Sequence, residues 1–376
     1  MDLRKFGKTD EYLFPLGFGT MRLPTLNNDN SLINEPEAIK MIRYAIDNGL
    51  NYVDTAFPYH GGNSEILVGK ALKDGYRKKT NIATKLPTWL IYNKKDLDKY
   101  FFEQLKKLQT DYVDFYLLHT LDKDLFEKMK NVDAFTWAEK KIKEGLIRYF
   151  GFSFHDEFPV FKEIVDYYPN FNFAQIQLNY LDTEYQAGLK GLKYANEKGL
   201  AVVIMEPLRG GELTNLPKEV VEIFSNVNKN KSIVEWAFDY LWNMKEVSVV
   251  LSGMSTFKQV EENLGFARRS YIGMLTQEEK EVYKRARDLI LHLRPVGCTG
   301  CGYCYPCSVD IDIPGVFDIY NKGYLFSNIS LAKKRYSSLK VNADACIECK
   351  ICESKCPQNL PISQLMKKIH MELSNE

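Results

Sequence analysis

Residues 97–119 read LDKYFFEQLKKLQTDYVDFYLLH, an amphipathic stretch followed by a nearly continuous apolar run. The first part, Leu97–Leu108, carries apolar residues at helical spacing. The second part, Val113–His119, is apolar enough for a strand that is covered on both faces, as strands of a parallel sheet are. This stretch therefore predicts one helix–strand unit of an α/β fold.

The same alternation extends in both directions, from Leu13 to about Ala267. The predicted strands are Leu16–Met21, Tyr52–Thr55, Asn81–Leu86, Val113–His119, Tyr149–Phe154, Ala174–Asn179, Ala201–Glu206 and Val247–Gly253. The predicted helices are Pro36–Asp47, Ser64–Leu72, Leu97–Leu108, Phe126–Ile142, Val160–Tyr167, Tyr185–Asn196, Ser232–Trp242 and Thr256–Phe266. Eight strand–helix units over roughly 250 residues predict a (β/α)₈ TIM barrel.

A doubly wound sheet is the competing architecture. It is disfavoured because no GxGxxG follows any predicted strand, and Gly17-Phe18-Gly19 lacks the third glycine. Before the first strand, Leu3–Phe6 and Leu13–Pro15 predict a small hairpin that closes the bottom of the barrel.

A boundary follows the barrel. Thr276-Gln-Glu-Glu279 is a capping-box sequence that predicts a helix to about Leu293, and Arg294-Pro-Val-Gly297 ends it. The predicted domains are therefore a barrel at residues 1–275, a connecting helix at 276–296 and a cysteine-bearing domain at 297–376.

Composition excludes several classes of protein. Among 376 residues, 50 are Lys or Arg and 49 are Asp or Glu, so a net charge of +1 offers no basic surface for nucleic acid or an anionic membrane. No apolar run reaches the 18 or so residues that a membrane span needs. Because the N-terminus lacks the apolar segment of a secretory signal, we expect a cytoplasmic protein.

All 8 cysteines lie between Cys298 and Cys356, which in a reducing compartment indicates metal or redox chemistry. Cys346, Cys349, Cys352 and Cys356 form C-x₂-C-x₂-C-x₃-C followed by proline, the run typical of bacterial ferredoxins. Cys298, Cys301, Cys304 and Cys307 form a similar run, with x₂ before its last cysteine and Ser308 in place of proline.

Two structural zinc sites are the alternative, but zinc prefers cysteine pairs that are separated by a dozen or more residues. Four cysteines within about eleven residues, occurring twice, favour two [4Fe–4S] clusters. In two-cluster folds the fourth cysteine of a run belongs to the other cluster. Helical patterns at Val316–Tyr320 and Leu331–Leu339 predict a small, mainly helical ferredoxin-like domain.

Four polar residues stand at strand ends or in the loops that follow, where barrel enzymes carry their catalytic groups. They are Asp54, Tyr59, Lys85 and His119. A buried Lys85 is costly unless it is paired, so we expect an ion pair with Asp54 beside Tyr59. Each residue alone could be structural, but together, on three successive strand ends, they indicate a catalytic site.

The residue types suggest the chemistry. A nearby cation favours the phenolate, so Lys85 is expected to bring the pKa of Tyr59 below its usual value of about 10. Tyr59 could then protonate a carbonyl oxygen while a hydride reaches the carbon. His119 would orient the substrate and stabilise the developing charge.

The segment Asp54-Thr-Ala-Phe-Pro-Tyr59-His-Gly-Gly-Asn-Ser-Glu65, with Thr84-Lys85-Leu86 and Leu117-Leu-His119, resembles the aldo-keto reductase family. The resemblance covers roughly residues 1–268, and with the cysteines the whole chain resembles the iron–sulfur branch of that family. It implies a barrel that binds NADPH or NADH without a Rossmann motif and reduces a small carbonyl substrate.

The resemblance also implies cofactor contacts. Ser153 and Gln175 would hold the carboxamide; Pro207, Leu208, Gly210 and Gly211 would approach the pyrophosphate; and Gly253, Ser255, Gln259, Glu262 and Asn263 would hold the adenosine end. Gly253 and Gln259 replace the Lys and Arg of members with a strong 2′-phosphate preference, although Lys258 could compensate. Phe154-His155 and Met205 also depart from the family pattern.

The link between the two halves stays open at this stage. Hydride transfer moves two electrons, whereas each cluster carries one, so direct exchange needs a flavin or another splitter. The clusters could relay electrons with a protein partner, or be structural or oxygen-sensing. The barrel could instead be a non-catalytic module that senses nucleotide. The alternative enzyme is a flavin-dependent oxidoreductase on the same barrel, although no flavin motif is found.

Overall fold

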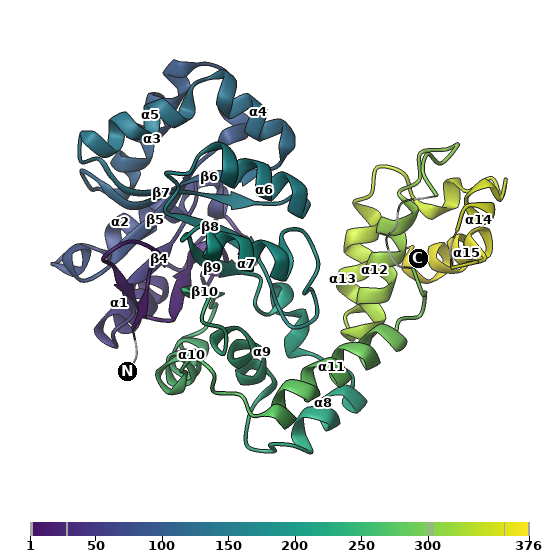
Figure 1. Cartoon of the computed structure of the whole chain (residues 1–376). Coiled ribbons are helices and arrows are strands. Elements are labelled where there is room, and N and C mark those ends of the chain that lie inside the picture. Colours follow the sequence, from purple (N-terminus) through teal and green to yellow (C-terminus); the bar gives the residue numbers. More distant parts are fainter. Residues whose placement is uncertain are drawn as a thin grey trace. The chain divides into compact units, whose positions relative to one another are not determined.

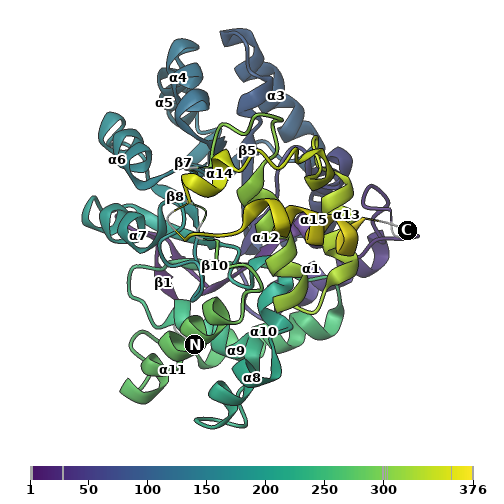
Figure 2. The same cartoon turned by 90° about the vertical axis from the view of Figure 1, so that its right-hand side faces the viewer.

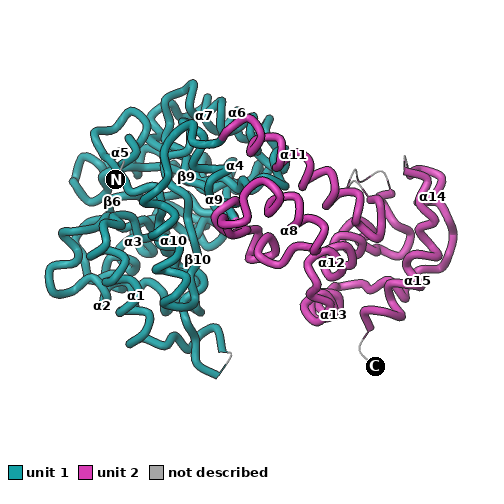
Figure 3. Tube along the Cα trace, turned by 90° about the horizontal axis from the view of Figure 1, so that it is seen from below, with its two compact units in different colours: residues 1–207, 237–275 teal, residues 208–236, 276–376 magenta. Residues whose placement is uncertain are grey.

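The computed structural model describes residues 3–27, 29–298, 300, 302, 304–356 and 358–374. The chain divides into two compact units. Unit 1 comprises Met1–Pro207 and Ala237–Leu275, and unit 2 comprises Leu208–Trp236 and Thr276–Glu376 (Figure 3). A segment from the middle of the chain thus groups with the C-terminal part.

Unit 1 contains a closed barrel of eight parallel strands (Figure 1). In chain order these are β3 (Leu16–Gly19), β4 (Tyr52–Asp54), β5 (Asn81–Leu86), β6 (Val113–Leu121), β7 (Ile147–Phe154), β8 (Phe173–Gln177), β9 (Ala201–Met205) and β10 (Val249–Gly253). β10 pairs with β3, which closes the barrel. The strands are almost wholly buried, as their apolar runs predict.

Helices surround these strands and confirm the predicted (β/α)₈ barrel (Figure 1). They are α1 (Glu35–Asp47), α2 (Ser64–Ala71), α3 (Lys94–Leu108), α4 (Lys123–Asn131), α5 (Ala134–Lys143), α6 (Phe158–Tyr167), α7 (Gly188–Glu197), α9 (Ile233–Trp242) and α10 (Phe257–Arg269). Short 3₁₀ turns occur at Thr20–Arg22, Tyr59–Gly62, Tyr76–Lys79 and Thr88–Leu90.

The predicted hairpin at the start of the chain is present. β1 (Arg4–Lys5) pairs antiparallel with β2 (Tyr12–Leu13). The fully buried Phe6 packs inside the barrel, with its ring centroid 4.7 Å from that of Phe115 and 5.3 Å from that of Phe173. These contacts close one end of the barrel with apolar rings.

One predicted helix is wrong in its extent. The stretch 126–142 belongs to two helices, α4 and α5, which are separated at Asp133. Asp133 has a φ of 58°, a left-handed conformation that interrupts a helix, and its carboxylate lies 2.8 Å from Lys94 Nζ. Aspartate tolerates this conformation better than most residues. The apolar periodicity of the sequence continues across Asp133, so it did not reveal the break.

Unit 2 is helical in its described residues. It contains α8 (Lys218–Ser225), α11 (Gln277–His292), α12 (Ile313–Leu325), α13 (Ile329–Ser337), α14 (Ile351–Ser354) and α15 (Ile362–Leu373), with 3₁₀ turns at Arg209–Thr214 and Ala343–Ala345. The capping box that begins α11 is as predicted, because Thr276 Oγ1 accepts from the Glu279 amide and Glu279 Oε2 accepts from the Thr276 amide. Helices α12 and α13 lie side by side (Figures 1 and 2).

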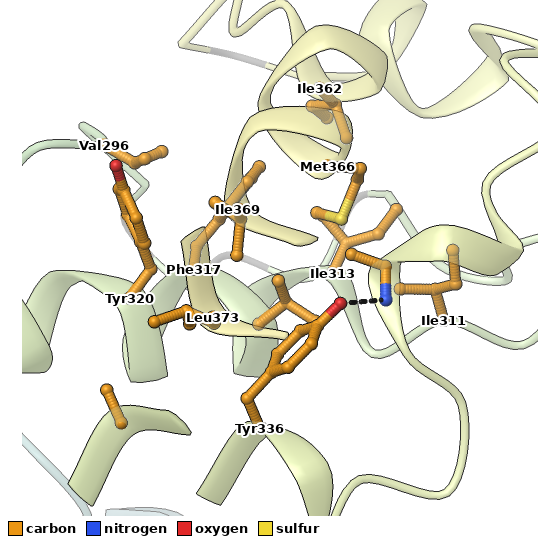
Figure 4. Close-up of a cluster of buried hydrophobic side chains, with 13 residues drawn as sticks. Val296, Ile311, Ile313, Phe317, Tyr320, Tyr336, Ile362, Met366, Ile369 and Leu373 are labelled. Carbon is orange, nitrogen blue, oxygen red and sulfur yellow. Dashed lines mark hydrogen bonds between the residues drawn. The ribbon is translucent and has the colours of Figure 1, made fainter. Parts of the chain in front are cut away.

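A small apolar core holds the C-terminal helices together (Figure 4). Phe317 of α12, Tyr336 of α13 and Met366 of α15 are buried in it, and the Tyr336 hydroxyl accepts a hydrogen bond from the Ala343 amide at 2.9 Å. Cysteine side chains pack against this core. Within the described part of the chain, no helix combines the length and the apolarity that spanning a bilayer requires.

Candidate active site and cysteine cavities

The predicted ion pair is present at the ends of β4 and β5. Lys85 Nζ donates to both carboxylate oxygens of Asp54, at 2.7 and 2.8 Å, and to the Thr55 carbonyl at 2.8 Å. The Lys85 side chain is 0% exposed and the Asp54 side chain 4%. All three ammonium donors therefore have acceptors, which compensates for the burial of the charge.

Tyr59 and His119 lie beside this pair. Lys85 Nζ is 5.2 Å from the centroid of the Tyr59 ring, and the centroids of Tyr59 and His119 are 6.2 Å apart in an edge-to-face arrangement. The ring of Trp89 also contacts His119, with its centroid 5.2 Å from that of His119. The structure thus brings together all four residues that the sequence singled out.

The pKa of Tyr59 differs from the expectation. Burial raises the pKa of the phenol above its usual value, and the opposing effect of Lys85 is the smaller one. Burial also opposes the charge on Lys85, but Asp54 and Tyr59 raise the pKa of the ammonium above its usual value. The site therefore combines a protonated phenol with a permanent cation.

His119 is held as a neutral ring. Burial is the main cause that brings its pKa well below the usual value, and the charges of Lys85 and His155 act in the same direction. No described residue hydrogen-bonds Nδ1 of His119, although this atom is buried. A buried polar atom without a protein partner at this position is suited to a ligand.

The loop that carries Tyr59 is anchored by His60. His60 adopts a φ of 53° and is 1% exposed. Its Nδ1 lies 2.6 Å from the Asn30 carbonyl, and its Nε2 accepts from the Leu23 amide at 3.3 Å. The two bonds assign a neutral ring with the proton on Nδ1, and they fix the residue next to Tyr59.

A buried polar network behind the site was not predicted. Glu65 Oε1 accepts from Thr84 Oγ1 at 2.7 Å and from Gln104 Nε2 at 2.6 Å, while Gln104 Nε2 also donates to the Lys85 carbonyl at 2.9 Å. Tyr116 donates its hydroxyl to Gln104 Oε1 at 2.8 Å. The network ties α2 and α3 to the strand end that bears Lys85. The sequence carries one indication of this network, because the polar Gln104 lies on the apolar face of a predicted helix.

Ser153 and Gln175 stand on the neighbouring strands β7 and β8, where they are paired in register. Ser153 Oγ accepts from the Thr120 amide at 2.7 Å, so it lies next to the strand end of His119. Gln175 is 3% exposed, and its Oε1 has no hydrogen-bond partner among the described residues. Its Nε2 faces Met205 Sδ at 3.7 Å.

The residues expected at the adenosine end surround the start of α10. Gln259 completes a capping box, and its Oε1 accepts from the amides of Ser255 and Thr256 at 2.8 and 3.2 Å. Asn263 is buried and donates to Ser252 Oγ at 3.1 Å. Glu262 is half-exposed and lies 3.6 Å from Lys258, and a Cβ on Gly253 would meet the Arg22 side chain at 3.1 Å.

The residues expected at the pyrophosphate fall on both sides of the boundary between the units. Pro207 is the last residue of the first segment of unit 1, whereas Leu208 and Gly210 belong to unit 2. Gly210 and Gly211 have φ values of 65° and 97°, inside the 3₁₀ turn Arg209–Thr214.

The described cysteines of unit 2 line two cavities. Cys298, Cys304 and Cys356 line the first, together with Phe317 and Ile313 of α12. Cys307, Cys346, Cys349 and Cys352 line the second. Each cavity thus takes its last cysteine from the other run, as in the crossed arrangement of two-cluster ferredoxins. Cys301 lies outside the described residues.

The described thiols are not gathered around a single point, as one metal ion would require. They stand on the walls of the two cavities, which also include apolar side chains such as Ile311 and Ile362. A cubane cluster holds its four thiolates apart from one another, so this donor set fits two iron–sulfur clusters.

Comparison with known proteins agrees with this geometry. The aldo/keto reductase family model matches residues 15–272, and a 4Fe-4S dicluster domain matches residues 297–361. L-galactose dehydrogenase of Arabidopsis thaliana is 30% identical over 286 residues, which cover 70% of this chain and 87% of that protein. The oxidoreductase YqkF of Bacillus subtilis is 28% identical over 333 residues, covering 77% of this chain and all of YqkF.

Among solved structures, the holo form of aldo-keto reductase AKR11C1 from Bacillus halodurans is similar, with a TM-score of 0.63 and 28% identity. The match covers 76% of this chain and 96% of that one. A barrel with these strand-end residues, followed by two crossed cysteine runs, therefore places the chain in the aldo/keto reductase family as an oxidoreductase that carries a C-terminal 4Fe-4S dicluster domain.

Proposed function

We propose that this protein reduces a small carbonyl compound by hydride transfer from NAD(P)H, with Tyr59 as the general acid. One observation carries the proposal: a fully buried lysine, bonded to both oxygens of Asp54, lies beside Tyr59 and a neutral His119. A nicotinamide nucleotide, when bound, supplies the hydride. The protein has to supply the proton and to stabilise the charge that develops on the carbonyl oxygen.

Each residue has a role that follows from its surroundings. The Tyr59 hydroxyl carries its proton near neutral pH, and Lys85 opposes the rise in its pKa that burial causes. Lys85 stays charged beside it and stabilises the phenolate after the proton has left. His119, which is neutral, can donate an N–H to the carbonyl oxygen without adding a second cation.

The nucleotide is proposed to bind along the ends of β7 to β10. Gln175 Oε1 and Ser153 would hold the carboxamide, and the start of α10 would hold the adenosine end with Ser255 and Asn263. The N-terminus of a helix suits a phosphate because its amides point outward. Neither Gly253 nor Gln259 supplies a cation for a 2′-phosphate, so we expect NADH and NADPH both to serve.

We further propose two [4Fe–4S] clusters with crossed ligands. Cys298, Cys301 and Cys304 would hold one cluster together with Cys356, and Cys346, Cys349 and Cys352 would hold the other together with Cys307. The described cysteines line two cavities in this same division, which supports the proposal.

The clusters are proposed to exchange electrons with a protein partner. The second cavity supports this role because Cys349 is exposed and its neighbours Ile347 and Ile351 are 63% and 51% exposed. Exposed apolar side chains beside a redox centre offer a contact surface to another protein. Electron exchange with the barrel would still need a flavin or another group that accepts two electrons from a hydride and passes them on one at a time.

The test is a titration of anaerobically purified holoprotein with NADH and NADPH, with and without a panel of carbonyl compounds. The panel includes aldoses and aldonolactones, because one relative is an L-galactose dehydrogenase. We expect nucleotide oxidation that depends on a carbonyl, with unchanged cluster absorbance. Bleaching of the clusters by nucleotide alone would instead reveal a flavin-type splitter. Nucleotide binding without turnover on any carbonyl would contradict the proposed reaction.

A further inference from the structure

The carbonyl of Lys85 stands where the neighbouring strand has ended. β4 pairs with β5 as far as Asp54, and the Thr55 amide then donates to the Ala83 carbonyl at 2.8 Å. In a parallel sheet, carbonyls two residues apart point to the same neighbour, so the Lys85 carbonyl faces the side that β4 has already left. A buried carbonyl in this place needs a donor that the sheet does not supply.

Gln104 of α3 supplies this donor. Its Nε2 donates to the Lys85 carbonyl at 2.9 Å and to Glu65 Oε1 at 2.6 Å. At the other end of the amide, Gln104 Oε1 accepts from the Tyr116 hydroxyl at 2.8 Å. Gln104, Glu65 and Tyr116 are fully buried, so water does not compete for these bonds.

The neighbours of Gln104 determine which way its amide points. Glu65 Oε1 also accepts from the Thr84 hydroxyl at 2.7 Å, and as an acceptor it selects the nitrogen of the amide. The Tyr116 hydroxyl selects the oxygen. An amide turned the other way would place its oxygen against the oxygens of Glu65 and Lys85. The orientation that holds Lys85 is therefore fixed by side chains behind the strand.

These contacts hold the strand from the face opposite to the site. Thr84 and Lys85 are consecutive in β5, so their side chains point to opposite faces of the sheet. Thr84 bonds the network, whereas Lys85 reaches Asp54 and lies beside Tyr59. Gln104 therefore acts on the backbone of Lys85, while the ammonium of Lys85 is bonded on the other face.

Lys107 joins the same helix to the loop that carries Tyr59. Its Nζ lies 3.8 Å from Glu65 Oε2 and 4.1 Å from the centroid of the Phe57 ring. Phe57 precedes Tyr59 by two residues, and its ring also packs edge-on against Tyr100 of α3, with the centroids 5.4 Å apart. Helix α3 thus contacts both the strand end that bears the cation and the loop that bears the acid.

We propose that Gln104 is a positioning residue of the reaction, which holds the backbone of Lys85 so that its ammonium stays beside Tyr59. Glu65 and Tyr116 orient the amide for this task. The inference rests on the proposed function, since Lys85 and Tyr59 carry the proton transfer there. A displacement of about 1 Å at such a site can lower the rate about 10²-fold.

The first test measures carbonyl reduction by the full-length holoprotein, with the clusters verified by their visible absorbance. Gln104→Met keeps nearly the same size and removes the donor. It should lower kcat about ten- to hundredfold, while KM for the carbonyl stays within about twofold. A wild-type kcat in this variant would overturn the proposal.

Leu105→Ala is the matched control, because it removes packing from the buried face of the same helix next to Gln104. It should lower thermal stability while kcat stays within about twofold of the wild-type value. An equal loss of kcat in Leu105→Ala and Gln104→Met would show that any damage to α3 lowers the rate, which contradicts a specific role of the amide.

A second readout depends on the charges that face Tyr59. Lys85 lowers the pKa of the phenol, whereas burial, Asp54 and Glu206 raise it. His119, whose ring centroid is 6.2 Å from that of Tyr59, is neutral and adds no charge. Moving the ammonium of Lys85 away should therefore raise the pKa of Tyr59 further.

The reverse reaction reports this pKa. In alcohol oxidation, the hydroxyl proton of the alcohol passes to the Tyr59 phenolate while the hydride leaves carbon for NAD(P)⁺, so the rate rises with pH as the phenolate forms. In Gln104→Met the rising limb should move to higher pH by about 0.5–1 unit. A variant that has only lost active protein would show a lower plateau with the limb in place, and that result would refute the positioning role.

Tyr116→Phe keeps the ring and removes only the hydroxyl that orients the amide. It tests the same role if Gln104→Met does not fold. Its kcat should fall about two- to tenfold, with a shift of the limb in the same direction. A limb that stays at the wild-type pH would count against the orienting role.

An exchange variant separates positioning from pairing. Glu65→Gln combined with Gln104→Glu restores an acid–amide pair but leaves the Lys85 carbonyl without its donor. It should be more stable than Gln104→Glu alone and keep a low kcat. Recovery of both properties would show that only the pairing matters and would overturn the proposal.

The wild-type protein distinguishes the two levels of inference. If it oxidises neither NADH nor NADPH with any carbonyl, the proposed function fails. If it is active and Gln104→Met is equally active, the proposed function stands and this inference alone fails.

Discussion

The strand ends of the barrel and the cysteine cavities hold their functional groups by opposite means. In the barrel, Lys85 finds three protein acceptors, and Glu65 and Gln104 support the strand end from behind. In the C-terminal domain, the thiols line cavities beside a small apolar core. The protein alone satisfies the buried charge of Lys85 at the first site, whereas we expect clusters to complete the second. Changes at the first should therefore affect chemistry, and changes at the second should affect folding.

The largest expected effect tests the barrel side of this contrast. Tyr59→Phe should lower kcat about 10²- to 10⁴-fold, because general acid catalysis contributes in that range. Cluster absorbance and thermal stability should stay at wild-type levels, since the ring is retained. Steady-state kinetics with the best carbonyl substrate gives the measurement. Tyr76→Phe is the control, because that hydroxyl bonds Asp47 on the surface at 2.7 Å, and a similar loss in this variant would count against the role of Tyr59.

The second expected effect tests the C-terminal side. Cys352→Ser should remove one cluster and leave residues 297–374 at least tenfold more sensitive to protease. We expect this because the free energy of binding the cluster contributes to the free energy of folding of this domain. Far-UV circular dichroism should retain the contribution of the barrel. Ser354→Ala, an exposed change on the same short helix α14, should leave both properties unchanged. A C-terminal domain that keeps wild-type protease resistance without its cluster would break the comparison.

The third expectation concerns pH. The pKa of His119 is depressed in the fold, so below about pH 6.5 the unfolded chain binds a proton that the folded chain does not. The free energy of unfolding should therefore fall as pH decreases below 6.5, by up to about 1.4 kcal/mol per pH unit from this group. Urea unfolding between pH 5 and 7 measures the slope. His119→Asn should flatten it.

The smallest expected effect tests a residue that sequence reasoning linked to the cofactor. Gln259→Ala removes the acceptor for two backbone amides at the start of α10, so it should cost about 0.5–2 kcal/mol of stability. Thermal unfolding measures the loss. Glu262→Ala, at a half-exposed residue on the same helix, should change stability by less than about 0.5 kcal/mol.

The barrel and the grouping of Asp54, Lys85 and His119 could be predicted because both depend on local pattern. Buried parallel strands are continuous apolar runs, and polar residues at their ends converge on one rim. The partners in the Glu65–Gln104 network could not be predicted. Gln104 on the apolar face of its helix indicates a buried polar contact, but nothing in the pattern pairs it with a residue 39 positions away.

The pKa of Tyr59 shows another limit of sequence reasoning. The neighbouring cation could be inferred from strand order, but the depth of burial that outweighs it is a property of the packed site. The break at Asp133 and the grouping of residues 208–236 with the C-terminal part were likewise set by tertiary contacts.

The grouping of residues 208–236 with the C-terminal part has a consequence for synthesis on the ribosome. α8 packs against α11, where Lys231 pairs with Glu279 at 2.9 Å and Tyr283 donates its hydroxyl to the Trp236 carbonyl at 2.8 Å. Lys231 and Trp236 therefore emerge 48 and 47 residues before these partners, and at 5–20 residues per second the delay is on the order of a few seconds. During that interval Phe224 and Trp236 lack the ring of Tyr283, which packs against both of them in the folded protein, so their apolar surface stays exposed on the nascent chain.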